Sequence, residues 1–347
     1  MAERGMRKLR TMFIGLLLMV FVAASCGGGD DGMINIAVVP KGLTHEFWKS
    51  IHAGALEAEK ELRSQGVQVS IDWQGPNKES DREQQIKIVE NQIGMGTDAI
   101  VLAPLDAQAL VRPVLEANKN DRPVVVIDSG LDIGEDKYIS FIATNNFEGG
   151  RKGGGRIADL VEVRQQSDRA FKPGIILLRY ELGHASTDAR ERGFLDMMEK
   201  RGLTDAILSS NQYAGATRES GQMKAEALLN QYRGRVNAIF CPNESSVYGT
   251  LQALRRTGLL GKVYVVGFDA TPALVEALRV GELHGLILQD PVRMGYLGVR
   301  FAVDALAGRP LEKRIDTGAW VATPDNMDDP EIALRLNPDL SILDEQR

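Results

Sequence analysis

Hydrophobic residues recur along this chain in short continuous runs, separated by longer stretches in which apolar and polar residues mix. A run such as Ile34–Val39 has the length and composition of a strand that is buried on both faces of a sheet. The pattern predicts strands at Ile34–Val39, Val67–Trp73, Ala99–Ala103, Val124–Asp128, Ile139–Ala143, Ile175–Arg179, Ala206–Ser209, Ala238–Cys241, Val263–Phe268 and Leu286–Gln289.

The intervening stretches are amphipathic and are predicted to be helices. One begins near Glu46, and others are expected at Glu79–Gly94, Ala107–Asn118, Asp188–Arg201, Arg218–Tyr232 and Ser245–Thr257. Apolar strands that alternate with helices predict parallel sheets with helices on both faces. Because the strands form two such series in 347 residues, we expect an α/β protein of two doubly wound lobes.

The first 26 residues differ in character from the rest of the chain. Four basic residues precede the apolar run Met12–Ala24, which is too short to span a bilayer comfortably. Small residues follow, and this order is typical of a secretory signal peptide over residues 1–25. The segment "VAASC" is similar to a bacterial lipobox, in which Cys26 becomes the lipidated first residue; the alternative is a simple cleaved signal. Residues 26–33 are expected to form a flexible linker.

Charge and cysteine content restrict the possible partners. Without residues 1–25 the chain has 37 Lys and Arg against 46 Asp and Glu, a net charge of −9. This excess argues against nucleic acid as a partner, because phosphate binding needs clustered positive charge. Beyond Cys26 the only cysteine is Cys241, so we expect no disulfide and a buried, inert thiol. The four histidines lack metal-ligand spacing and no nucleophile elbow occurs, so neither a metal site nor a hydrolase is expected.

Polar and aromatic residues gather directly after the predicted strands, where ligands bind in open α/β sheets. Asp and Asn pair with hydroxyl groups, arginine offers a planar fork of donors, and aromatic faces cover the apolar side of a ring. This mix fits a small polyhydroxylated molecule in a cleft. The segments are "KGLTHEFW" (41–48), "APLDA" (103–107), "IDSG" (127–130), "RYELGHASTDARERG" (179–193), "NQYAG" (211–215), "CPNES" (241–245), "GFDAT" (267–271) and "LQDP" (288–291).

Several of these residues also have an ordinary structural interpretation. Phe47 and Trp48 could fix a helix to the sheet. Asp128 and Asp269 suit turns or helix caps, and Asn243 suits the cap of the helix that follows it. Their shared position at strand ends in both series favours a binding site over these separate roles.

The motifs and their order resemble the periplasmic sugar-binding proteins of bacterial ABC importers, the ribose-binding type. The resemblance runs from about Ile34 to Thr317 and implies two lobes joined by three crossing segments, near 143–145, 289–290 and 315–317. It implies a first lobe of residues 34–143 plus 291–315 and a second of 144–289 plus 317–347. The matching motifs are Phe47-Trp48, "IDSG", "STDARERGF", "CPNES", "VVGFDATP" and "LQDPVRMGYLGVR".

The resemblance also implies a function and a site. The protein would capture a small sugar or polyol between its lobes and deliver it to the membrane permease of an ABC importer. It would be a monomer in the periplasm or at the cell surface, without enzymatic activity or a cofactor. The implied ligand contacts are His45, Phe47, Trp48, Asp128, Ser129, Arg190, Tyr213, Asn243, Asp269 and Gln289, with Lys41 as a further candidate.

Two departures from the ribose-binding pattern bear on the ligand. Ser129 stands where ribose binders have an arginine and His45 where they have an asparagine, so ribose itself is not expected. The segments "VPKG" and "WQGP" instead resemble the branch that binds rhamnose or a furanosyl autoinducer, in which the lysine matching Lys41 contacts the ligand. A sugar-sensing accessory to a receptor kinase is a further alternative. A transcription repressor is not expected, because a signal peptide precedes the fold in place of a helix-turn-helix.

Overall fold

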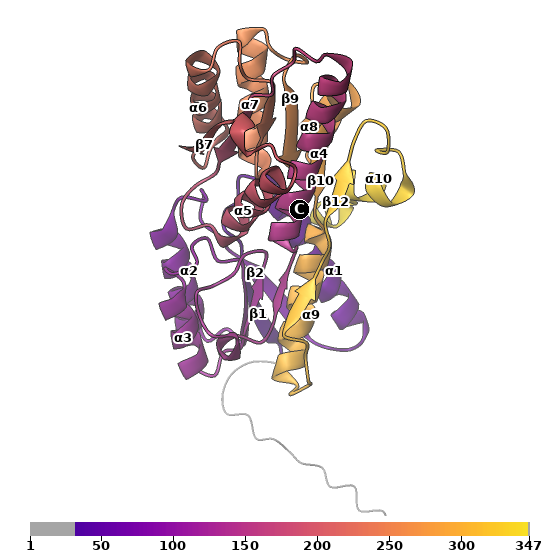
Figure 1. Ribbon diagram of the computed structural model, residues 1–347. Helices are drawn as coiled ribbons and strands as arrows, with labels where there is room; N and C mark the ends of the chain where they lie inside the picture. Colours follow the sequence, from indigo (N-terminus) through magenta and orange to yellow (C-terminus); the bar gives the residue numbers. More distant parts are fainter. Residues whose placement is uncertain (1–31, 346–347) are drawn as a thin grey trace, which may run out of the picture. The chain divides into compact units, whose positions relative to one another are not determined.

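The computed structural model describes residues 32–345 (Figure 1). The expected signal peptide, most of the linker and Cys26 lie outside the described residues. Residues 33–345 form one compact unit, which contains both of the sheets. Within the described residues, no helix combines the length and hydropathy of a membrane span.

The first sheet is parallel throughout and is covered by helices on both faces. It contains β1 (Ile34–Val39), β2 (Val69–Trp73), β3 (Ala99–Leu102), β4 (Val124–Ile127), β5 (Phe141–Ala143) and β11 (Arg314–Asp316), and its helices are α1 (Glu46–Ser64), α2 (Arg82–Met95), α3 (Val111–Lys119) and α9 (Pro291–Leu306). The strand order is β11-β5-β4-β3-β1-β2. Ile36 and Val38 pack with α1 and α9, whereas Ala37 and Val39 pack with α2 and α3. Burial of both faces explains why residues 36–39 of β1 are all apolar.

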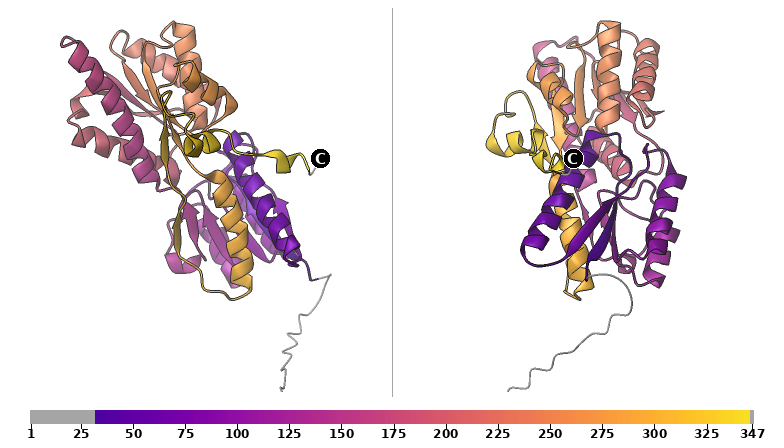
Figure 2. Two further views of the ribbon diagram at one scale, coloured as in Figure 1. Left: turned by 90° about the vertical axis from the view of Figure 1, so that its right-hand side faces the viewer. Right: turned by 180° about the vertical axis from the view of Figure 1, so that it is seen from behind.

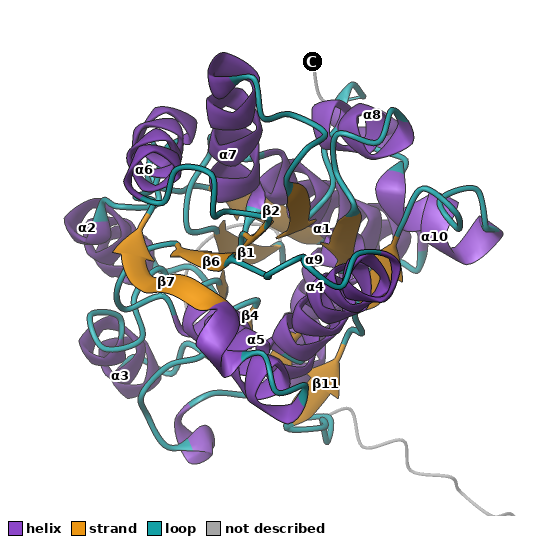
Figure 3. Ribbon diagram, turned by 45° about the horizontal axis from the view of Figure 1, so that its top comes forward, coloured by secondary structure: helices purple, strands orange, loops and turns teal. Residues whose placement is uncertain are grey.

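The second sheet has a similar build. It contains β6 (Ile175–Arg179), β7 (Ile207–Tyr213), β8 (Ala238–Phe240), β9 (Tyr264–Phe268), β10 (Gly285–Leu288) and β12 (Trp320–Ala322), in the order β12-β10-β9-β8-β6-β7. One face is covered by α4 (Asn146–Ser167) and α5 (Ala185–Lys200), and the other by α6 (Arg218–Gln231), α7 (Glu244–Thr257) and α8 (Pro272–Arg279). Helices therefore surround the strands, as Figure 3 shows.

The chain passes between the two sheets at three places. It leaves the first sheet after β5, returns between β10 and α9, and leaves again between β11 and β12. Thr144 and Asn145, at the first crossing, hydrogen-bond to Gly318 (3.1 Å) and Asp316 (3.0 Å) at the third. We call the first sheet with its helices the first lobe, and the second sheet with its helices the second lobe. The predicted fold class, two doubly wound lobes joined by three segments, is confirmed.

Some details differ from the sequence-based expectations. Strand β12 pairs antiparallel with β10, so the second sheet is mixed and not wholly parallel. Strands β11 and β12 and the helix α10 (Pro330–Leu336) were not predicted, because elements this short carry little periodicity. The short helix η3 (Ser341–Leu343) packs on α1 of the first lobe, although it falls within residues 317–347, which were expected in the second lobe (Figure 2). An ion pair between Lys60 and Glu345 (2.8 Å) accompanies this contact.

Candidate functional site

A small, polar cavity of about 30 Å³ lies where the carboxyl ends of the central strands of both sheets meet. Nine of the eleven residues predicted to contact ligand line it, and both lobes contribute. The lining residues are Lys41, His45, Phe47, Trp48, Glu79, Asp128, Tyr180, His184, Ser186, Thr187, Arg190, Asn243, Asp269 and Gln289.

Phe47 and Trp48 lie in the first turn of α1 and are both buried. Their rings meet edge to face, with centroids 5.0 Å apart. Both side chains belong to the hydrophobic core beneath α1 and also line the cavity. The aromatic pair therefore has the structural role that the sequence offered and also lines the cavity, because a helix that starts at a strand end brings its first turn to the edge of the sheet.

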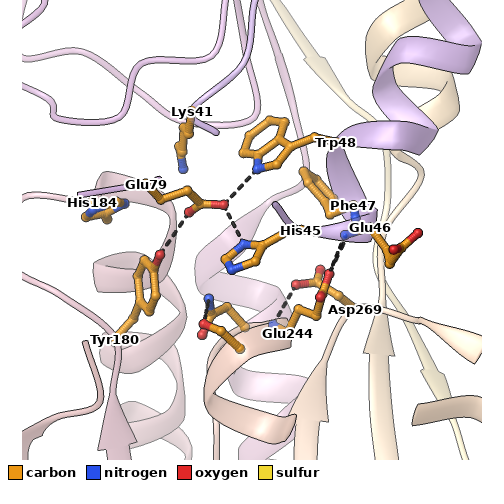
Figure 4. A network of polar contacts seen from close by, with 12 residues as sticks. Lys41, His45, Glu46, Phe47, Trp48, Glu79, Tyr180, His184, Glu244 and Asp269 are labelled. Carbon is orange, nitrogen blue, oxygen red and sulfur yellow. Dashed lines mark hydrogen bonds and ion pairs between the residues drawn. The ribbon is translucent and has the colours of Figure 1, made fainter. Parts of the chain in front are cut away.

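Glu79 is the centre of a buried hydrogen-bond network (Figure 4). It precedes α2 and lies 2.5 Å from Nδ1 of His45. Its carboxylate accepts hydrogen bonds from Trp48 Nε1 (2.7 Å) and, across the lobes, from the hydroxyl of Tyr180 (3.0 Å). The sequence placed Glu79 at the start of a helix, but α2 begins three residues later, so its side chain is free to enter the cavity.

The pKa values of this pair show that both residues are charged at neutral pH. Burial alone would lower the pKa of His45, but the Glu79 carboxylate, with smaller effects of Glu244 and Asp269, raises that pKa to about 9. Burial alone would raise the pKa of Glu79, yet His45, Lys41 and His184 hold it well below its usual range. His45 and Glu79 thus form a buried ion pair within the first lobe.

Lys41 and Asp128 form a second buried ion pair. Their charged atoms are 2.7 Å apart, and about 4% or less of either side chain is exposed. Lys41 also donates a hydrogen bond to Ser186 Oγ of the second lobe (2.9 Å). Lys41 therefore joins both lobes while its charge is balanced within the first.

Asp128 and Asp269 occupy equivalent positions in the two lobes. Asp128 follows β4 and Asp269 follows β9, and both have left-handed backbones, with φ of 61° and 70°. Aspartate is among the few non-glycine residues that adopt this conformation, which carries some strain and is common at functional sites. With this left-handed backbone conformation, both aspartates line the cavity.

Arg190, in α5, is buried and held from three sides. Its guanidinium donates to Asn146 Oδ1 (2.7 Å) and to the carbonyl of Pro242 (2.9 Å), and it lies 4.1 Å from the ring centroid of Phe268. Burial lowers the pKa of Arg190, while the charges of Asp269 and Asp128 act in the opposite sense. These contacts fix the planar fork against the cavity.

Asp269, Gln289 and Asn243 complete the wall on the side of the second lobe. Asp269 accepts hydrogen bonds from Gln289 Nε2 (2.6 Å) and from the backbone NH of Glu244 (3.1 Å). Burial raises the pKa of Asp269, and Arg190 opposes that rise. Asn243 caps α7 by accepting from the NH of Ser246 (3.4 Å) and also lines the cavity, so the expected capping role does not exclude a site role.

Glu244 links the lobes beside the cavity. Its carboxylate accepts hydrogen bonds from the backbone NH of Glu46, at the first residue of α1 (2.9 Å), and from Arg218 (2.6 Å). Helix α1 has no side-chain cap of its own at His45, so this carboxylate of the second lobe satisfies its amino-terminal end.

Two predicted contacts lie outside the cavity wall. Ser129 is buried, and its Oγ accepts a hydrogen bond from the NH of Ser186 (3.2 Å), which places it between the lobes. Tyr213 was expected just past a strand end, but β7 runs on to include it, at the edge of the second sheet (Figure 3). The strand was predicted too short because its last residues are polar, as an edge strand allows. The ring centroid of Tyr213 instead lies 5.9 Å from the guanidinium carbon of Arg179.

Five residues that line the cavity were not among the predicted ligand contacts: Glu79, Tyr180, His184, Ser186 and Thr187. Four of them fall within the segment 179–193, which the sequence had marked as a strand end. Only side-chain direction separates them from their neighbours, and residue type does not reveal that direction. For Glu79 no strand-end signal exists, because it stands before a helix.

This arrangement defines a class of protein: two α/β lobes that share one small binding site between them. Residues 36–310 match the family model described as a periplasmic binding protein domain, and the chain belongs to that family. The D-ribose/D-allose-binding protein of Pseudomonas aeruginosa is 32% identical over 287 residues, which cover 81% of this chain and 85% of that protein. The D-allose-binding periplasmic protein of Escherichia coli is 28% identical over 316 residues, 89% of this chain and 96% of that one.

Solved structures agree with the sequence relatives. A carbohydrate transporter solute binding protein from Agrobacterium radiobacter, in complex with D-arabinose, matches with a TM-score of 0.80 and 30% identity, over 89% of this chain and 100% of that one. An ABC transporter solute binding protein from Agrobacterium vitis with bound D-fucose also gives a TM-score of 0.80 at 30% identity, over 87% of this chain and 100% of that one.

Proposed function

We propose that this protein is an extracytoplasmic, monomeric solute-binding protein that captures a neutral sugar or polyol between its lobes and delivers it to the permease of an ABC importer. The observation that carries the proposal is the internal balance of charge in the cavity. Lys41 pairs with Asp128, His45 pairs with Glu79, and Arg190 is coupled to Asp269. A charged ligand would bring a buried charge for which the cavity has no free counter-charge, whereas hydroxyl groups can accept hydrogen bonds from these side chains and donate to them.

The relatives support the same ligand class. Two are named for ribose or allose and two hold arabinose or fucose, and all four of these molecules are neutral monosaccharides. We assign the ligand contacts to the nine predicted residues that line the cavity, with Phe47 and Trp48 covering the apolar side of the sugar ring. These relatives are binding proteins, and the proposed role requires no catalysis.

Binding on this proposal includes a movement of the lobes. The cavity of about 30 Å³ is far smaller than typical small-molecule pockets of roughly 300 Å³ or more, so a sugar ring enters only when the lobes separate. Direct contacts between the lobes, such as Tyr180 with Glu79 and Glu244 with Glu46, break when the lobes separate. Closure follows from the higher affinity of the sugar for the closed form, in which both lobes contact it.

The experiment that tests the function is a titration with neutral pentoses, hexoses, deoxy sugars and polyols, with sugar acids and amino acids as controls. At 100 times its dissociation constant, a ligand raises the free energy of unfolding by about 2.7 kcal/mol, which a thermal melt detects. Small-angle scattering should report a monomer whose radius decreases on saturation. Binding of an amino acid, peptide or sugar acid in preference to every neutral sugar contradicts the proposal, and an unchanged radius contradicts closure.

We further propose that Cys26 is acylated and anchors the mature protein to a membrane. The proposal rests on the short apolar run and small residues before this cysteine. Cys26→Ala is expected to release the exported protein from the membrane fraction. Cys241→Ala is the matched control, because Cys241 is buried and should not affect partitioning. Equal partitioning of Cys26→Ala and the wild type into membranes contradicts the anchor.

A further inference from the structure

His184 stands out among the residues of the cavity wall. It directly precedes α5, is fully buried, and lines the cavity from the second lobe (Figure 4). Neither of its ring nitrogens has a hydrogen-bond partner within the described part of the chain. The Glu181 carboxylate is 3.5 Å from Nε2 but makes no hydrogen bond with it, and the Tyr180 ring meets the imidazole edge-on at 4.9 Å.

The other three histidines have contacts that explain their positions. His45 pairs with Glu79, His284 accepts a hydrogen bond from the NH of Val265 (3.2 Å), and His52 stacks on Trp73 at 4.3 Å. His184 differs from them because it is fully buried while neither of its ring nitrogens makes a hydrogen bond within the described residues. A buried polar group without a partner costs free energy, and a site residue whose partner is the ligand is one physical reason to keep it.

We propose that His184 is a specificity-determining contact that hydrogen-bonds hydroxyl groups of the bound sugar. This inference rests on the proposed function and adds a residue to it. An imidazole ring has two nitrogens that can each form a hydrogen bond with a hydroxyl group, so it can pair with one hydroxyl or with two neighbouring hydroxyls. Its neighbours in the wall include Tyr180 and Ser186, so that end of the cavity selects sugars that present hydroxyl groups there. A sugar that lacks them would leave His184 buried and unpaired, which disfavours it.

The test compares His184→Phe with the wild type and with the control His52→Phe. Phenylalanine keeps a planar ring but removes both polar atoms, and His52 lies outside the cavity. For the tightest-binding neutral sugar, calorimetry should show at least about tenfold weaker binding by His184→Phe and unchanged binding by His52→Phe. The melting temperature without sugar should not fall in His184→Phe, because the variant removes an unpaired polar group.

Two further measurements separate a ligand contact from a packing role. The ring nitrogen signals of His184, assigned by their loss in His184→Phe, should shift in NMR spectra when the wild type is saturated with sugar. Among monodeoxy derivatives of that sugar, at least one should bind the wild type more weakly than the parent yet bind His184→Phe as well as the parent does.

The outcomes distinguish this inference from the proposed function. If the wild type binds a sugar and His184→Phe binds it equally well, His184 is not a contact, although sugar capture stands. If the ring signals stay unchanged on saturation, the inference is likewise overturned. If the wild type binds no neutral sugar, the proposed function fails, and the inference fails with it.

Discussion

Replacing Arg190 with alanine is expected to weaken sugar binding by about 2–5 kcal/mol, the largest loss for any single residue of the site. Arg190 is buried and donates to Asn146 and to the carbonyl of Pro242, so its removal also leaves these acceptors without their partner. Asp269, with which its charge is coupled, loses that compensation as well. Asp269→Ala should cause a loss in the same range, because it leaves Gln289 Nε2 buried without its acceptor and removes the carboxylate that compensates the charge of Arg190.

Arg192 provides the matched control for this prediction. It lies two residues further along α5 but is exposed, so Arg192→Ala should bind sugar as the wild type does. Arg190→Lys keeps the positive charge but loses the planar guanidinium. An affinity between those of the wild type and Arg190→Ala would show that the charge and the planar geometry each contribute to binding. Affinities are measured by titration calorimetry on variants whose melting curves show a folded protein. Wild-type affinity in Arg190→Ala would place the binding site elsewhere.

The second large effect concerns stability and pH. The pKa of His45 is about 9 in the folded protein, against about 6.5 in the unfolded chain, so the folded state binds the extra proton more tightly. The resulting stabilisation is fully present below pH about 6.5 and is lost as the pH rises through about 9. The shift corresponds to about 3 kcal/mol of unfolding free energy.

Denaturant unfolding at pH 6 and at pH 9.5 measures this effect. His45→Gln should lose most of the difference between the two pH values, and Glu79→Gln should lose it too, because the Glu79 carboxylate is the main cause of the raised pKa. His52→Gln is the control, since burial lowers the pKa of His52 and its ring lies outside this network. If His45→Gln retained the pH dependence of the wild type, the ion pair would not be its source.

Local patterns along the chain were enough to predict the alternation of strands and helices and the edge on which the site lies. β1 and β6 were predicted with the bounds that the structure has, because four consecutive positions of each strand are buried and apolar. Asp128, Asn243 and Asp269 follow such strands closely, and they line the cavity because parallel sheets bring the ends of their strands together. The order of residues alone carries these signals.

Contacts between distant segments, in contrast, determine which neighbouring side chains enter the cavity and which lobe each short segment joins. Glu79 and Tyr180 meet only because two segments far apart in the chain face each other across the lobes. Tyr213 misses the cavity because an edge strand tolerates polar residues and runs on through it. The packing of η3 on the first lobe and the unpaired ring of His184 likewise depend on which surfaces meet after folding. No spacing of residue types encodes such contacts, since they arise from the way the folded lobes meet.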